Sequence, residues 1–239
     1  MSPRVVKTRV AIGSADLDAL LPAERACAER LRLGEHRRAE WRAGRLAAHE
    51  ALAALLGASA AAGLAVVSAD DGAPLVAVAV AVAVGVADKG PDVALSISHG
   101  KKFAVAAAGH VPRLGIDLCE VARAPNVQRI SERFLHEAER TLPRTPADWA
   151  LLWALKEAAA KALRRGLFDG GLAASRVASL ATPAFAFPDL AVEVEVGEDD
   201  VVAVVYDGYD GYDGYDGYDG SDGSDGAPRG ERLISRLRS

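Results

Sequence analysis

The chain reads Trp153-Ala154-Leu155-Lys156-Glu157-Ala158-Ala159-Ala160-Lys161-Ala162-Leu163 in its second half. On a helix, Trp153, Glu157 and Lys161 lie within about 80° of one another. A carboxylate with lysines beside it can hold a hard cation while the lysines neutralise phosphate oxygens. The other interpretation is an exposed Glu-to-Lys pair, which stabilises a helix by only about 0.2–0.5 kcal/mol. The rest of the chain decides between the two.

Length and composition indicate a soluble protein. The chain has 239 residues, half of them hydrophobic, which is enough for one or two cores of ordinary domain size. Cys27 and Cys119 are far apart in sequence and have no metal-ligand spacing, so we expect neither a disulfide framework nor a zinc site, and a cytoplasmic location fits. Residues 1–10 lack the apolar segment of a secretory signal. The apolar run 74–87 is too short to span a bilayer, so we expect no membrane partner.

The acidic charge is concentrated at the C-terminus. The net charge is −5, and residues 206–239 hold eight acids and four arginines, so the body is close to neutral. This balance argues against a nucleic-acid partner. Residues 206–226 repeat Tyr-Asp-Gly five times and Ser-Asp-Gly twice, without an aliphatic residue to pack, which predicts disorder. Calcium binding is the alternative, but a three-residue period lacks the spaced ligands of known calcium loops.

Hydrophobic periodicity predicts an α+β protein with small, mainly antiparallel sheets. We expect an αβ half at 1–109, a second αβ half at 110–205 that carries the Glu157 helix, and a disordered tail at 206–239. The expected helices cover residues 22–33, 35–56, 127–142 and 149–165. The expected strands cover residues 5–12, 64–68, 75–84, 93–98, 103–108, 113–119, 192–196 and 201–206.

A second acid lies within the expected strand 113–119. Alternation sends Leu114, Ile116 and Leu118 to one face, and Gly115, Asp117 and Cys119 to the other. Aspartate is disfavoured in strands, so Asp117 is either a polar residue on a solvated face or part of a site. Glu120 points away from Asp117 unless a bulge intervenes.

The stretch Ser96-Ile97-Ser98-His99-Gly100 ends another expected strand. A hydrolase is disfavoured because adjacent strand residues diverge and no Gly-x-Ser-x-Gly motif is present. His99 beside Lys101 and Lys102 suits a phosphate contact, and a solvent-exposed histidine at a hairpin end is the alternative.

The expected helix 35–56 carries a basic stripe about 60° wide, formed by Arg38, Arg42, Arg45 and His49. Such a stripe is either a solvated face with snorkelling side chains or a site for an anionic ligand such as a nucleotide phosphate.

In this order, Ser96-Ile-Ser-His99, Gly115-Ile-Asp117 and Trp153-Ala-Leu-Lys156-Glu157-Ala-Ala-Ala-Lys161-Ala resemble the motifs of the 4′-phosphopantetheinyl transferases. The chain resembles their larger, single-chain class, which activates polyketide and peptide synthases. Supporting matches are Gly72-Ala-Pro74, Phe134-Leu-His-Glu-Ala-Glu139 and Gly44-Arg45. The resemblance covers roughly residues 20–170.

The resemblance implies a monomeric pseudo-dimer of two αβ halves that binds coenzyme A in the cleft between them. It implies transfer of the phosphopantetheine arm to a serine of an acyl or peptidyl carrier protein, with release of adenosine 3′,5′-bisphosphate. Asp117 and Glu157 would hold Mg²⁺, and Glu157 or a metal-bound water would take the serine proton. Lys161 would contact the pyrophosphate. The other implied coenzyme contacts are His99 with Ser98, Lys156, Arg45, and Arg25 or Arg38.

Cys119 departs from the family pattern, because many relatives have a second acid at that position. We therefore expect two protein carboxylates on Mg²⁺, with water completing the shell. The alternatives to an active transferase are a catalytically silent protein that binds carrier domains or coenzyme A, and a calcium-responsive interaction protein built around the tail.

Overall fold

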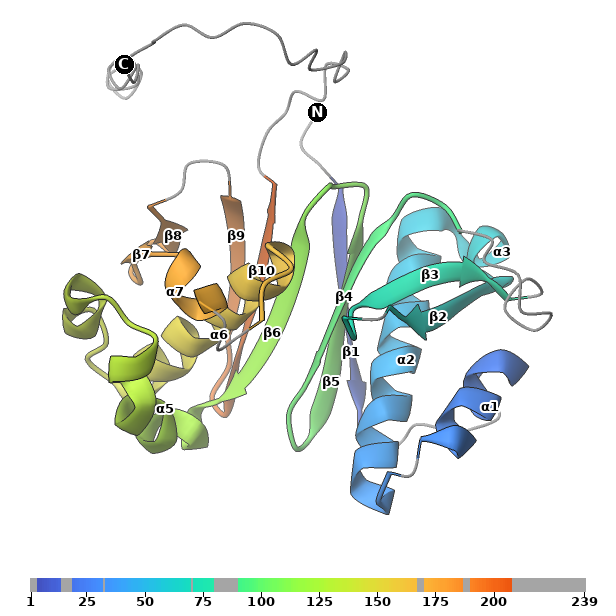
Figure 1. The fold of residues 1–239 in the computed structure, drawn as a ribbon, viewed down its shortest axis with the longest axis horizontal. Helices are drawn as coiled ribbons and strands as arrows, with labels where there is room; N and C mark the ends of the chain where they lie inside the picture. Colours follow the sequence, from blue (N-terminus) through green and yellow to red (C-terminus); the bar gives the residue numbers. More distant parts are fainter. Residues whose placement is uncertain are drawn as a thin grey trace, which may run out of the picture.

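The computed structural model describes residues 4–13, 19–31, 33–69, 71–79, 90–166, 170–186 and 190–207. Two three-stranded antiparallel sheets stand next to each other at the centre, and a long helix packs on the outer side of each (Figure 1). Helices and antiparallel sheets are mixed along the chain, which confirms the expected α+β class.

The first sheet has the order β1 (Val5–Ala11), β5 (Phe103–Gly109) and β4 (Ala94–His99). Helix α2 (Glu35–Leu56) covers its outer face with a stripe of small residues, and it packs against the alternate alanines of β5. A Cβ on Gly44 would lie 3.0 Å from Cγ2 of Ile97, so glycine lets this helix approach β4. The expected bounds of α2 are confirmed.

Smaller elements complete this part of the chain. Helix α1 (Pro22–Arg30) precedes α2, and helix α3 (Ala58–Ala61) follows it. Strands β2 (Leu64–Ser68) and β3 (Pro74–Val78) pair as a hairpin. The expected strand 75–84 is confirmed only as far as Val78, because residues 80–89 lie outside the described part of the chain.

The second sheet has the order β6 (Leu114–Glu120), β10 (Asp200–Asp207) and β9 (Leu190–Val196). Helix α6 (Pro146–Ala162) covers its outer face. The helix begins earlier than the expected residue 149 because Thr145 caps it: the Thr145 hydroxyl accepts from the Asp148 amide at 3.2 Å, and Asp148 accepts from the Thr145 amide in return.

The expected continuous helix 127–142 is wrong. The chain forms η2 (Val121–Arg123), α5 (Ala124–Ile130), η3 (Ser131–Arg133) and η4 (Glu137–Thr141) instead. Phe134 and Glu139 are both buried, and on one straight helix they would lie about 140° apart. The break allows both to reach the core. Helix α7 (Leu172–Ala174) and strands β7 (Val177–Ser179) and β8 (Ala184–Phe185) are short and were not expected.

The two sheets share a hydrophobic core. Alternate residues of β5, β6 and β10 turn toward it, and they include Val105, Ile116, Leu118 and Val204. Where β4 runs beside β6, serine hydroxyls bridge the strands: the Ile116 amide donates to the Ser96 hydroxyl at 3.0 Å and the Leu118 amide donates to the Ser98 hydroxyl at 3.4 Å. We call this β4–β6 contact the seam.

Strand β10 includes the first Tyr-Asp pair of the repeat. The Tyr206 hydroxyl donates to Glu193 at 3.0 Å, and Asp207 accepts from Nε of Arg113 at 2.6 Å. The expected boundary before residue 206 therefore falls inside a strand, and residues 208–239 lie outside the described part.

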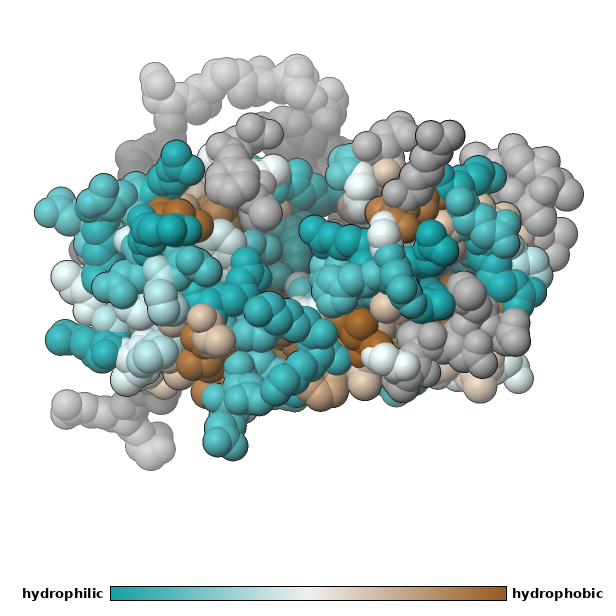
Figure 2. Space-filling model, turned by 90° about the horizontal axis from the view of Figure 1, so that it is seen from below, coloured by the Kyte–Doolittle hydropathy of each residue, from teal (hydrophilic) through white to brown (hydrophobic). Residues whose placement is uncertain are grey.

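In the part of the chain that the structure describes, no helix is long and apolar enough to cross a membrane. The lower face is mostly hydrophilic, with hydrophobic groups in separate small areas (Figure 2).

Candidate functional site

Asp117 lies at the centre of the site. Strand alternation in β6 turns it toward α6, as predicted, and only 3% of the residue is exposed. One carboxylate oxygen, Oδ1, accepts from the Ser98 hydroxyl at 2.7 Å and from the Lys161 ammonium at 2.8 Å. Strands β4 and β6 and helix α6 therefore meet at this carboxylate.

Lys161 links Asp117 to both sides of the seam. Its ammonium also donates to the carbonyl of Ile116 at 2.9 Å and to that of Ile97 at 3.4 Å. Its side chain is 29% exposed, so the charge remains accessible. The long bond to Ile97 is the one that a ligand oxygen would most easily replace.

Glu157 lies one helical turn before Lys161, and its carboxyl group interacts with the carboxylate of Asp117. Burial and the negative charge of Asp117 raise the pKa of Glu157 to about 7, although Lys161 and Arg123 act in the opposite direction. Two interacting, largely buried carboxyl groups repel each other when both are ionised, so a divalent cation can take the place of the proton that would otherwise neutralise one of them. The chemistry of this donor pair fits Mg²⁺.

Gly115 explains how α6 comes so close to β6. A Cβ on Gly115 would lie 1.9 Å from the carbonyl oxygen of Ala158 and 2.8 Å from the amide nitrogen of Ala162. Only glycine fits at this distance. The short helix–strand distance brings Glu157 and Lys161 to Asp117.

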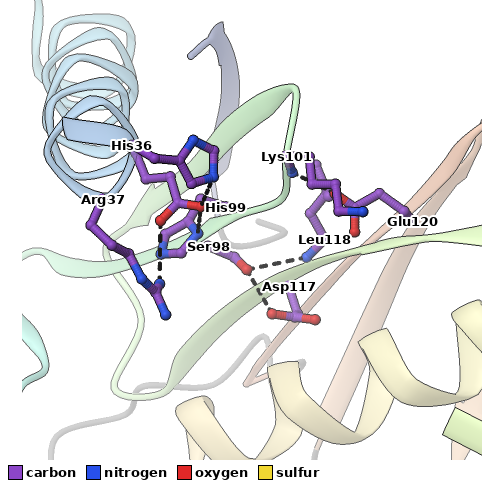
Figure 3. A network of polar contacts seen from close by, with 9 residues as sticks. His36, Arg37, Ser98, His99, Lys101, Asp117, Leu118 and Glu120 are labelled. Atoms are coloured by element: carbon purple, nitrogen blue, oxygen red, sulfur yellow. Dashed lines mark hydrogen bonds and ion pairs between the residues drawn. The ribbon is translucent and has the colours of Figure 1, made fainter. Parts of the chain in front are cut away.

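Cys119 and Glu120 do not supply a third acid. Cys119 is fully buried, and desolvation raises its pKa to about 12, so it is a neutral thiol. Glu120 points away from Asp117, as predicted, and accepts from the amide of Lys101 (Figure 3). Among the described residues, no three or more His, Cys, Asp or Glu side chains cluster as metal ligands would.

His99 faces α2 rather than Asp117, because neighbouring residues of β4 alternate (Figure 3). Its Nδ1 lies 3.9 Å from Oε1 of Glu40. Arg37 Nη1 also reaches Glu40, at 3.2 Å, whereas Arg38 is exposed and donates to the Leu33 carbonyl at 3.0 Å. Arg37, which the sequence analysis missed, therefore joins His99 in place of Arg38. The i,i+3 spacing of Arg37 and Glu40 was the available signal.

Arg45 lies further along α2 and is largely buried. Its guanidinium stacks over the ring of Trp41 at 4.6 Å and donates to the Ser68 hydroxyl at 3.2 Å. Burial lowers its pKa, and the negative charge of Glu24 opposes that shift. Glu24 also pairs with His49 at 2.9 Å. The expected basic stripe is therefore partly neutralised and buried.

Arg25 is half-buried on α1. The Asp117 carboxylate accepts from Ser98 and Lys161, whereas Arg38 donates to the Leu33 carbonyl and Arg45 to the Ser68 hydroxyl.

Lys156 does not join the site, which corrects the expected coenzyme contact. It is fully buried, and its ammonium donates to both carboxylate oxygens of Glu139, at 2.9 and 3.1 Å, and to the carbonyl of Ser175. All three of its N–H groups are thereby used. Glu139, also buried, accepts from the amide of Val177 at 2.7 Å. Trp153 is likewise in the core, where its ring packs edge-on against Phe134 at 5.1 Å.

Replacing Lys156 with methionine is expected to destabilise the protein by about 3–5 kcal/mol, because it leaves the Glu139 carboxylate buried without its counter-ion. Denaturant unfolding measures this effect. The double variant Lys156→Met with Glu139→Gln should recover part of the loss. A Lys156→Met variant as stable as the wild type would contradict the structural role.

A cavity of about 1270 Å³ reaches the site at Lys161. Lys161 and Ser96 contribute to its wall, together with Gly72-Ala73-Pro74 and Arg165. Across it, Arg164 of the α6 end pairs with Asp71 of the β2–β3 turn at 3.2 Å. The cavity exceeds a typical small-ligand pocket, and it can take a nucleotide-sized molecule whose phosphates reach Lys161.

Comparison with protein families identifies the part of the chain that carries the acids. Residues 113–187 match the model of the 4′-phosphopantetheinyl transferase superfamily. The match runs from the start of β6 to just past the end of β8 and includes Asp117, Glu157 and Lys161. No curated protein matches the chain.

Proposed function

We propose that the protein transfers the 4′-phosphopantetheine arm of coenzyme A to a serine of an apo acyl or peptidyl carrier protein. The observation that carries this proposal is the Asp117–Glu157 carboxylate pair with Lys161 beside it, inside a domain of the phosphopantetheinyl transferase superfamily. The superfamily supports phosphopantetheinyl transfer in general; the acceptor and the metal are our proposals.

In the reaction, the serine hydroxyl oxygen attacks the phosphorus that bears the pantetheine arm. The bond to the leaving phosphate breaks, and adenosine 3′,5′-bisphosphate departs. Lys161 gives up its hydrogen bond to the Ile97 carbonyl and donates to a pyrophosphate oxygen instead, which neutralises charge there. Ser98 holds the Asp117 carboxylate through its hydroxyl. Glu157 is the group of the described chain placed to accept the serine proton.

Asp117 and Glu157 would hold Mg²⁺, which supplies charge neutralisation on the pyrophosphate when bound. The neutral thiol of Cys119 is not a ligand. We therefore propose two protein carboxylates, with water in the remaining positions. His99 and Arg37 would contact other phosphate groups of the coenzyme. Arg45 belongs to α2 and Arg25 to the preceding helix, α1.

The two sheets also support a pseudo-dimer, because each has the order first strand, last strand, preceding strand: β1-β5-β4 and β6-β10-β9. This arrangement favours the larger single-chain class and a monomer, and we also propose a cytoplasmic location. The coenzyme would then lie in the cavity beside the seam, where residues of both halves contribute to the wall.

The test is incubation with coenzyme A, Mg²⁺ and several apo carrier proteins, followed by mass spectrometry of the carrier. We expect the carrier to gain one phosphopantetheine, and the gain to vanish with a chelator. A mass gain on none of the carriers, with coenzyme binding intact, would favour the catalytically silent alternative.

Cys119→Glu is expected to lower the Mg²⁺ concentration for half-maximal activity roughly tenfold, because it adds a third carboxylate on the same face of β6. A magnesium titration of the initial rate measures this effect. Cys119→Ser is the matched control and should leave the titration unchanged. An unchanged titration for Cys119→Glu, with the fold intact, would contradict the proposal that water takes the place of the acid missing at this position.

A further inference from the structure

Glu40 of α2 is a buried acid that the proposed reaction does not use. Its side chain is only 10% exposed, and three basic groups surround it: Nε2 of His36 at 3.1 Å, Nη1 of Arg37 at 3.2 Å and Nδ1 of His99 at 3.9 Å. A buried carboxylate needs such partners, because its desolvation is otherwise unfavourable.

The exposure of these groups is graded. The side chains of His36 and Arg37 are each 67% exposed and that of His99 is 38% exposed, whereas Glu40 lies beneath them. In an ordinary exposed salt bridge on a helix, the acid would be in contact with water just as its basic partner is. Here one buried acid pairs with three basic side chains that are more exposed than it is.

This cluster borders the carboxylate site. His99 directly follows Ser98, whose hydroxyl donates to Asp117. The charges of both Lys161 and Asp117 act on His99. Glu40 therefore connects α2 to the end of β4 at the point where the seam meets the site.

We propose that Glu40 is a positioning residue that holds His36, Arg37 and His99 as one binding site for a phosphate group of the coenzyme. The proposal rests on the proposed function. Fixed side chains lose little conformational entropy when the anion binds, and charge-assisted bonds from arginine and protonated histidine are the strong ones. Without Glu40, the three groups would be free to separate.

The charge state of His99 gives a readout that a purely structural role would not change. Burial lowers the pKa of His99, and Glu40 is the largest influence that raises it. The charged groups that act on it are Glu40 and Arg37 of α2, Lys161 of α6 and Asp117 of β6, with His36 beside Glu40. Neutralising Glu40 lowers the pKa of His99 further. As pH rises, His99 must then gain a proton in order to bind phosphate, so the loss of binding should grow with pH.

The test compares Glu40→Gln with Glu50→Gln, a matched change at an exposed position of the same helix. Calorimetric titration with adenosine 3′,5′-bisphosphate at pH 6 and pH 8 measures binding, and the KM for coenzyme A and the kcat are measured with a carrier. For Glu40→Gln we expect roughly tenfold weaker binding and a raised KM at pH 8, a smaller loss at pH 6 and a kcat within about twofold of wild type. Glu50→Gln should match the wild type.

Equal affinities of the two folded variants at pH 8 would overturn the proposal, as would a loss of kcat without a change in KM. If Glu40→Gln does not fold, Arg37→Gln tests the same cluster, since its side chain is mostly exposed, and unchanged binding there would also overturn it. A protein that binds the bisphosphate in a Glu40-dependent way but modifies no carrier would contradict the proposed transfer alone.

Discussion

Replacing Glu157 with glutamine is expected to reduce phosphopantetheine transfer about a thousandfold, because the amide keeps the shape but removes one of the two metal carboxylates and the candidate base. The initial rate of carrier modification at saturating Mg²⁺ measures the effect. Coenzyme binding in the absence of metal should change little. A variant with more than a tenth of the wild-type rate would exclude Glu157 from the site.

The same variant has a second readout in metal-free buffer. The pKa of Glu157 in the folded protein is raised to about 7 from the usual 4.5, so the folded state binds this proton more tightly than the unfolded state does. Stability is therefore present at low pH and falls as pH rises from about 4.5 to about 7. Glu157→Gln removes this penalty, and its Tm at pH 8 should exceed that of wild type by a few degrees. At pH 4 the two proteins should be alike.

Replacing Gly115 with alanine is expected to destabilise the protein by about 4 kcal/mol or more. The new Cβ would lie 1.9 Å from the carbonyl oxygen of Ala158, and neither backbone can move alone, since both belong to regular elements. Denaturant unfolding measures the stability. Transfer activity should fall as well, because a displaced α6 carries Glu157 and Lys161 away from Asp117.

Gly63→Ala is the matched control for this change. A Cβ there would meet no atom within 4 Å, so the stability should change by less than about 1 kcal/mol. If Gly115→Ala were as stable as Gly63→Ala, the close packing of α6 on β6 would not hold in solution.

Much of this fold follows from local sequence patterns. The bounds of α2 and of β2 were predicted correctly, because a long stretch with helical periodicity and a short β-branched run are each bounded by turn residues. The two faces of β6 follow from alternation alone. The helix expected at 127–142 was wrong because burial of Phe134 and Glu139 depends on α6, which no local pattern includes.

A site residue could be predicted from the sequence where a single strand or helix fixes the direction of its side chain. The face of β6 that carries Asp117 and the face of α6 that carries Glu157 and Lys161 follow from their periodicity, whereas the ion pair between Asp117 and Lys161 was not expected. Lys156 was misplaced because its partner, Glu139, lies in the segment 127–142, which was expected to form one continuous helix. Arg37 was missed because the stripe chosen on α2 passes through Arg38, whereas the end of β4 selects the other face.

The serine hydroxyls of the seam link the contact between β4 and β6 to the charge at the acids. The Ser98 hydroxyl accepts from the amide of Leu118 and donates to Asp117, so a change of charge at that carboxylate alters a bond that holds β4 to β6. Amide hydrogen exchange at Leu118 should therefore change when a cation binds the acids, whereas exchange at Ile116, whose amide donates to Ser96 instead, is the internal reference. One backbone proton would then report metal binding without a substrate or a label.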